Sequence, residues 1–302
     1  MRRISPRSSS KRRRRSGLPL SVALVWTIVS GALAASGRDA EPQGDRPPSA
    51  LATSVGPGDE VADELESERD SFTPATAVVG RGRSVVEAAY SFLDNRHGDD
   101  SHSFPELLTR VGVFDRVELR LGWNYEMGGG GSVSSSGSSS EGEDEEESKD
   151  EGRVLYGLKF LVSKQRAWIP QSSLIVQAWT PTSGPSDTTT FMGAYVFGWK
   201  MRNDWVLDAA LRFGTAEEEG DHYRELAPSV VLKVPVLERW NAHVEYFAVV
   251  TQDRMGDVDK HYVTPGVHYL LTPDLEIGVR VGAGLNDDSG RFFTNAGLAM
   301  RF

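Results

Sequence analysis

Residues 291–302 read RFFTNAGLAMRF, and two kinds of side chain alternate along this stretch. Every second position carries an apolar or small residue, at Phe292, Thr294, Ala296, Leu298 and Met300. Successive side chains of a β-strand point to opposite faces of its sheet, so this period of two predicts a strand with one apolar and one mixed face. A free strand edge can pair with other chains and aggregate. We therefore expect this strand to pair with another strand of the same chain.

The same alternation recurs from Ser84 onward. In residues 116–125, RVELRLGWNY, Val117, Leu119 and Leu121 share one face and charged residues share the other. We predict about twelve strands, each near the ~9–11 residues that a tilted membrane strand needs. The predicted strands span residues 84–93, 104–113, 116–125, 153–163, 172–180, 190–201, 204–214, 224–235, 239–250, 260–271, 274–284 and 291–302.

The connections between the predicted strands differ in length. Those after even-numbered strands are mostly short, as at Phe114-Asp115 and Thr272-Pro273, whereas those after odd-numbered strands are longer and polar. Short turns on one rim and long loops on the other are typical of outer-membrane barrels. We therefore predict an all-β fold, an antiparallel transmembrane outer-membrane β-barrel over residues 84–302.

The N-terminal residues have the features of a targeting sequence. Residues 1–16 are basic, and the apolar stretch that follows ends in Ala32-Leu33-Ala34, so residues 1–34 are predicted to be a secretory signal peptide, with an uncleaved anchor as the alternative. The chain has a formal net charge of -10 and no cysteine. No basic patch follows residue 34, so nucleic acid is not an expected partner, and no disulfide framework is available.

Two further segments differ from the strands in composition. Residues 35–83 are rich in Pro, Gly, Ser, Asp and Glu, which predicts a disordered periplasmic lead-in, with a plug inside the barrel as the alternative. Residues 126–152 are expected to form a long, acidic extracellular loop that is solvated. Its alternative role is to bind divalent cations or bridge to anionic lipids, although it lacks the pattern of a calcium-binding loop.

Two stretches, FPELLTRVGVFDRVELRLGWNY (104–125) and HYVTPGVHYLLTPDLEIGVRVGAGLNDDSGRFFTNAGLAMRF (261–302), resemble the outer-membrane transporter family named for the MetA pathway of phenol degradation. The resemblance is carried by Pro105, Glu106, Gly112, Asp115, Arg116, Glu118, Arg120, Thr264, Pro265, Gly266, Gly282, Gly284, Leu285 and Asn286. It covers roughly residues 84–302, and the long acidic loop departs from it. The resemblance implies an outer-membrane barrel involved in the passage of aromatic or other small molecules.

The alternating residues of the last strand also fit an outer-membrane assembly signal, which has a terminal aromatic residue and apolar residues at alternate positions before it. The matching residues are Ala296, Leu298, Met300 and Phe302. The expected partners are therefore the barrel-assembly machinery, outer-membrane lipid and a small-molecule solute, and the expected location is the bacterial cell outer membrane.

Charged residues on the faces opposite the apolar ones are expected to line the lumen. Acidic and basic side chains there would either set a transverse field across a pore, which confers selectivity, or pair with one another and fill the barrel. The candidate lumen-lining residues are Glu106, Arg110, Glu118, Arg120, Asp208, Arg212, His243, Glu245, Glu276 and Arg280.

The predicted function is a channel for the passive passage of small molecules, without cofactor or metal. One alternative is a structural barrel with a filled lumen, and another is a soluble exported β-domain, which charged inner faces argue against. A third is a membrane-embedded hydrolase, which would need a serine, a histidine and a polar partner on the outer face. His243 lies on the lumen side by its parity, and no serine is placed near it by spacing, so no enzyme is expected.

Overall fold

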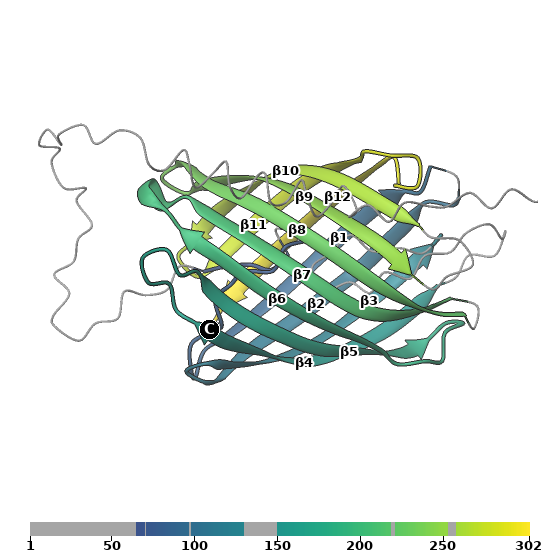
Figure 1. The fold of residues 1–302 in the computed structure, drawn as a ribbon, viewed down its shortest axis with the longest axis horizontal. Coiled ribbons are helices and arrows are strands. Elements are labelled where there is room, and N and C mark those ends of the chain that lie inside the picture. The colour runs from purple at the N-terminus through teal and green to yellow at the C-terminus, as the bar shows by residue number, and fades with distance from the viewer. Residues whose placement is uncertain (1–64, 70, 97, 130–149, 219–220, 253–257) are drawn as a thin grey trace, which may run out of the picture.

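The computed structural model describes residues 65–69, 71–96, 98–129, 150–218, 221–252 and 258–302. Within these residues, twelve strands follow one another in chain order around a closed barrel (Figure 1). The prediction of a closed antiparallel barrel of about twelve strands is confirmed. The strands are β1 Ser84–Asp94, β2 Ser101–Phe114, β3 Val117–Gly128, β4 Glu151–Ser163, β5 Gln171–Ser183, β6 Thr190–Lys200, β7 Val206–Glu218, β8 Asp221–Leu237, β9 Trp240–Gln252, β10 Asp259–Thr272, β11 Leu275–Gly284 and β12 Phe292–Arg301.

The strand bounds differ most from the predicted ones in the β7–β8 hairpin. The ladder between these strands continues until Glu218 pairs with Asp221, beyond the predicted ends at residues 214 and 224. Backbone hydrogen bonding between strands needs no apolar face, so the ladder extends past the alternation that marked it in the sequence. The long acidic connection is shorter than predicted for the same reason, because β3 ends at Gly128 and β4 begins at Glu151.

Burial alternates along β1, β11 and β12 as the sequence pattern predicts, whereas in β7 to β9 several outward-facing residues, among them Leu207 and Ala248, are buried as well. In β1, Glu87 is completely buried, whereas its neighbour Val86 is 37% exposed. Leu121 and Val279 likewise present exposed apolar side chains on the outer surface. The barrel is therefore apolar outside and polar inside, the reverse of a soluble barrel and the arrangement expected for lipid contact.

The barrel closes where β12 pairs with β1. The ladder runs over ten residue pairs, from Val85 opposite Arg301 to Asp94 opposite Phe292. Two further backbone hydrogen bonds join Ser84 and Phe302, at 3.1 and 2.8 Å. Closure leaves neither strand with a free edge, which explains why the alternation of residues 291–302 continues to Phe302.

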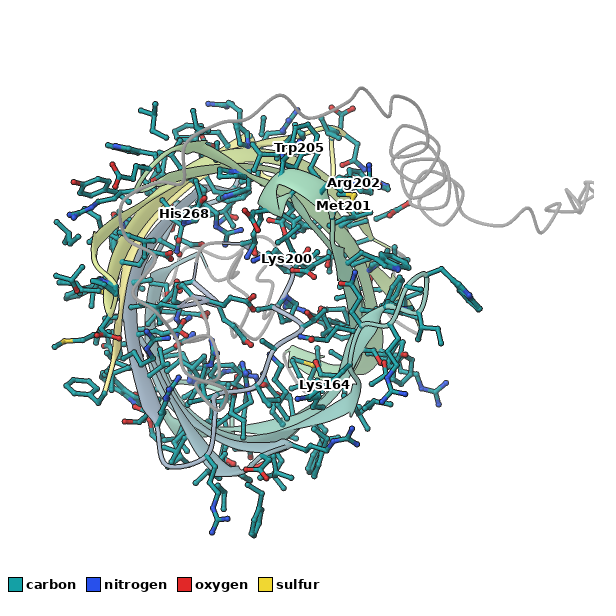
Figure 2. The ribbon with its side chains drawn as sticks, turned by 90° about the vertical axis from the view of Figure 1, so that its left-hand side faces the viewer. Lys164, Lys200, Met201, Arg202, Trp205 and His268 are labelled. Atoms are coloured by element: carbon teal, nitrogen blue, oxygen red, sulfur yellow. The ribbon has the colours of Figure 1, made fainter. Side chains whose placement is uncertain are left out.

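A segment that precedes β1 lies inside the barrel. We call residues 65–83, of which all but Asp70 are described, the lumenal segment. Glu68 and Ser71 within it are completely buried, and Phe72 and Val79 are nearly so. Figure 2 looks into the short-turn end of the barrel, where Lys200 and Arg202 are labelled at the rim, and shows chain and side chains within the ring of strands. The barrel lumen is thus occupied by the protein's own backbone.

The prediction of a disordered lead-in over residues 35–83 is wrong for residues 65–83, most of which are buried and fit its alternative, a plug inside the barrel. The sequence has few large apolar residues there, and composition alone therefore indicated disorder. The segment is instead ordered by charged partners on the barrel wall, which its own sequence does not reveal. The predicted signal peptide and residues 35–64 lie outside the described residues. No helix in the described part of the chain is long and apolar enough to cross a membrane.

The outer apolar surface leads to a first prediction. Val279 lies at the middle of β11 and faces outward, so Val279→Arg should destabilise the barrel in a lipid bilayer by about 2–4 kcal/mol. Val236, beside the short turn after β8, also faces outward, and Val236→Arg should cost only about 0–1 kcal/mol. Urea titrations of the protein in lipid vesicles, followed by tryptophan fluorescence, measure both. Equal costs at the two positions would contradict a lipid-facing outer surface.

Candidate functional site

The ten charged residues chosen from the sequence are all buried, and none is more than 7% exposed. They do not form one continuous row. The structure places four of them on β2 and β3, three around Glu245, and three near the short-turn end. In the first two places the lumenal segment contributes partners, which the sequence did not reveal.

The first group is a charged cluster that holds the start of the lumenal segment. Arg110 on β2 and Arg120 on β3 are direct cross-strand partners, an arrangement of like charges that is unfavourable by itself. Glu68 of the lumenal segment offsets this repulsion, because its carboxylate lies 2.6 Å from Arg120 Nη2 and 3.9 Å from Arg110 Nη1. Lys159 Nζ on β4 lies 2.6 Å from the same carboxylate.

Further ion pairs complete the charged cluster. Arg110 contacts Glu87 at 2.9 Å and Glu118 at 3.3 Å. Glu106 instead accepts a hydrogen bond from Arg69 of the lumenal segment at 3.2 Å. Four carboxylates and four cations therefore meet in a buried volume, and the lumenal segment supplies one of each. The desolvation cost of burying these eight charges is offset because each charge lies next to an opposite charge.

The electrostatics of Glu68 follow from this arrangement. Burial raises the pKa of its carboxyl group, but Arg120, Lys159 and Arg110 act in the opposite direction. Their combined effect is larger, so the pKa of Glu68 lies well below its ordinary value of 4.5. Glu68 is therefore ionised at neutral pH and holds the lumenal segment against β2, β3 and β4.

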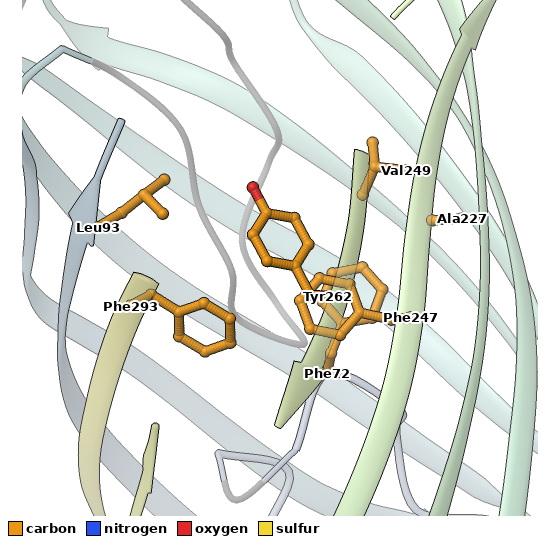
Figure 3. Close-up of a cluster of buried hydrophobic side chains, with 7 residues drawn as sticks. All are labelled: Phe72, Leu93, Ala227, Phe247, Val249, Tyr262 and Phe293. Carbon is orange, nitrogen blue, oxygen red and sulfur yellow. The ribbon is translucent and has the colours of Figure 1, made fainter. Parts of the chain in front are cut away.

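The second group is an aromatic niche around Phe72, and Figure 3 shows Phe72 with the rings of Phe247, Tyr262 and Phe293. The Phe72 ring stacks on Phe247 of β9, with ring centroids 4.1 Å apart and an interplanar angle of 9°. Its other neighbour is Arg212 of β7, whose guanidinium carbon lies 3.9 Å from the Phe72 ring centroid. Tyr262 of β10 stacks on Phe247 at 4.9 Å, and Phe293 of β12 lies 5.7 Å from Tyr262.

Glu245 of β9 anchors the backbone of the same residues. One carboxylate oxygen accepts a hydrogen bond from Phe72 N at 2.9 Å. The other accepts from Thr73 N at 2.6 Å and from Thr73 Oγ1 at 2.7 Å. Arg280 of β11 lies 3.3 Å from Glu245, and Arg212 donates a hydrogen bond to the Phe72 carbonyl oxygen. We define the aromatic niche as Arg212, Glu245, Phe247, Tyr262 and Phe293.

The third group lies near the short-turn end of the lumen. His243 Nδ1 and His268 Nε2 are 2.6 Å apart, and His268 Nδ1 lies 3.8 Å from Glu276. A cavity of about 190 Å³ opens beside them, and Asp208 and Glu66 contribute to its lining. Among the described residues, no group of three or more His, Asp or Glu side chains is placed to hold a metal ion.

A further part of the inner wall is apolar, which the selection of charged residues overlooked. Ile175 on β5, Ala194 and Val196 on β6, and Ala210 on β7 are buried together in one cluster. The aromatic niche was overlooked for the same reason. Its signal in the sequence is the aromatic Phe247, which lies in phase with the polar His243 and Glu245 on the inner face of β9.

The predicted assembly residues lie on the outer surface. Leu298, Met300 and Phe302 are 44%, 42% and 64% exposed, and Ala296 is exposed with them. Their role in assembly stays a prediction. In the long acidic connection, residues 130–149 lie outside the described residues, while Glu151 at its end forms an ion pair with Arg153 at 2.7 Å.

The fold defines a class of protein, the closed outer-membrane type of β-barrel with an apolar exterior and a polar lumen. Solved structures that share this fold include the following two. An outer membrane channel from Pseudomonas putida F1 has a TM-score of 0.51 and 12% identity over 79% of this chain and 100% of that chain. The NanC porin has a TM-score of 0.51 and 8% identity over 71% of this chain and 98% of that chain. At such identities the likeness concerns the fold alone.

A family model described as "Putative MetA-pathway of phenol degradation" matches residues 67–302, and the chain belongs to this family. The family inferred from the resemblance is thereby confirmed. The match begins at residue 67 and so includes most of the lumenal segment as well as the barrel. A comparison with curated proteins gave no match.

The charged cluster leads to a second prediction. Glu68→Gln leaves three buried cations without a shared carboxylate, and should weaken docking of the lumenal segment by about 3–5 kcal/mol. The chain has no cysteine, so a single cysteine in place of the buried Ala75 reports docking by its rate of maleimide labelling. We expect Glu68→Gln to raise this rate roughly 100-fold or more, since each 1.4 kcal/mol is a factor of ten.

The matched control removes an ion pair at the surface. Lys200 and Asp204 lie 3.2 Å apart with side chains 57% and 72% exposed. Such a pair contributes little, about 0–1 kcal/mol, so Asp204→Asn should leave the labelling rate of the cysteine at position 75 almost unchanged. Equal labelling rates in the two variants would show that Glu68 does not hold the segment.

A third prediction concerns pH. The pKa of Glu68 is depressed when the segment is docked, so its contribution to docking is complete above its ordinary value of 4.5 and is lost as the pH falls through the depressed value. Pepsin is active in this range, and we expect it to cleave the lumenal segment increasingly fast below pH 4.5, relative to an unstructured peptide. Glu68→Gln should be cleaved quickly at every pH tested; an unchanged pH profile in this variant would assign the effect to other carboxylates.

Proposed function

We propose that the protein is an outer-membrane channel for the passive passage of small molecules, including aromatic and hydrophobic compounds. The observation that supports this most directly is what fills the lumen. The interior is occupied by the lumenal segment, which is none of the twelve strands and is held in the lumen by ion pairs and hydrogen bonds. The part of the segment before Gly80 can leave the lumen without breaking a strand pair of the barrel.

The chemistry of the wall supports the solute class. The inner surface carries the charged cluster, the aromatic niche and an apolar strip around Ile175 and Val196. A wall with both apolar and charged parts suits solutes that combine a hydrophobic body with a polar group. The family to which the chain belongs is named for phenol degradation, which agrees with this class. Location in the outer membrane is part of the proposal.

A structural barrel with a permanently filled lumen is the second candidate. The observation in its favour is the near-complete pairing of buried charges around Glu68, which makes displacement costly. The two candidates differ in whether the lumenal segment ever leaves the lumen.

Conductance across a planar lipid bilayer tests this as a fourth prediction. We expect brief current steps from the full-length protein and more frequent, longer steps from Glu68→Gln, because the weaker ion pairing releases the lumenal segment more often. Asp204→Asn serves as the control and should match the parent. Silence in all three proteins, with the barrel shown to be folded by its heat-dependent gel mobility, would favour the structural barrel.

A further inference from the structure

We propose that the aromatic niche is a binding site for a small aromatic solute that carries a hydroxyl group, and that Phe72 and Thr73 occupy this site when the lumen is closed. The proposal deepens the proposed function and rests on it for the route by which a solute reaches the lumen. The niche would be the binding site of a solute in the lumen, and its side chains would select the solute.

The niche belongs to the barrel wall and not to the lumenal segment. Its residues come from four strands, with Arg212 on β7, Glu245 and Phe247 on β9, Tyr262 on β10 and Phe293 on β12. Strand pairing fixes their positions, as shown by Phe247 and Tyr262, which are direct cross-strand partners. Tyr262 is held further by its hydroxyl group, which accepts a hydrogen bond from Gly290 N at 2.9 Å. The niche is therefore built whether or not Phe72 is present.

The shape of the niche selects a flat ring. Phe72 lies between Phe247, which is parallel to it at 4.1 Å, and the guanidinium of Arg212 at 3.9 Å. Stacking on one face and a cation on the other both depend on the π-electrons of the ring. A saturated ring of the same size fills the space but gains neither interaction, so the site distinguishes aromatic from aliphatic solutes.

The polar groups of the niche select a hydrogen-bond donor on that ring. Glu245 accepts three hydrogen bonds from Phe72 and Thr73, one of them from the Thr73 hydroxyl group. When the segment leaves, a buried carboxylate loses these donors and retains its contact with Arg280. Leaving buried acceptors without donors is costly, so a solute hydroxyl that donates to Glu245 is favoured. An aromatic ring with a hydroxyl group reproduces the ring of Phe72 and the hydroxyl of Thr73.

Solute and lumenal segment therefore compete for the same place. A site that its own chain occupies binds a solute with an apparent affinity reduced by the fraction of time it is free. By the same linkage, a solute that binds the free niche favours release of the segment. Phe72 acts as a built-in competitor that couples solute binding to opening of the lumen.

The test uses the full-length protein in detergent, with phenol as the probe and cyclohexanol as the saturated analogue of the same size. Calorimetric titration should show that Phe72→Ala binds phenol at least about tenfold more tightly than the parent. Asp204→Asn is the control, because Asp204 lies outside the lumenal segment and its side chain is 72% exposed. It should bind phenol as the parent does, and cyclohexanol should bind weakly to every variant.

A second measurement leaves Phe72 in place. In the protein with cysteine in place of Ala75, phenol should accelerate maleimide labelling and cyclohexanol should not. Adding Glu245→Gln to Phe72→Ala should reduce the gain in phenol affinity. The proposal is overturned if Phe72→Ala binds phenol no better than Asp204→Asn, or if phenol and cyclohexanol behave alike in both measurements.

The outcome separates this inference from the proposed function. A protein that conducts in bilayers but shows no preference for phenol after Phe72→Ala contradicts the niche and leaves the channel intact. A barrel that binds phenol as expected but never conducts supports the niche and contradicts passage.

Discussion

The pairing of β12 with β1 is the constraint on which the rest of the structure depends. A strand edge in lipid would leave backbone groups without hydrogen bonds, so the sheet has to close. Closure fixes which face of every strand is inside, and it creates an interior that strand side chains line but do not fill. Arg110 and Arg120 meet on that inner wall as cross-strand partners, and their repulsion creates a place for the carboxylate of Glu68.

The barrel itself could be predicted because a membrane-spanning strand needs apolar residues at every second position. Leu119 and Leu121 alternate with Glu118 and Arg120 because one face meets lipid and the other meets polar surroundings, so local sequence determines the side-chain direction. The strand ends were less predictable, since the ladder between β7 and β8 continues to Glu218 where no apolar face marks it.

The candidate site could be predicted only in part, because its chemistry arises from contacts between distant segments. The inward direction of Glu245 follows from its parity, yet its partners are Phe72 and Thr73, more than 170 residues away in sequence. Composition indicated disorder for residues 65–83, since their stability comes from the wall and not from their own apolar content. The niche could not be predicted from charge, because Phe247, Tyr262 and Phe293 are uncharged.

The path of the lumenal segment has a topological consequence. Leu65 packs with Val85 and Ala299 near the short-turn rim, and the segment returns to that rim where β1 begins at Ser84. The segment enters and leaves through the same mouth, as a loop folded back on itself and not as a thread through a ring. A pull applied from the short-turn side can therefore peel it out contact by contact, with the barrel remaining closed throughout.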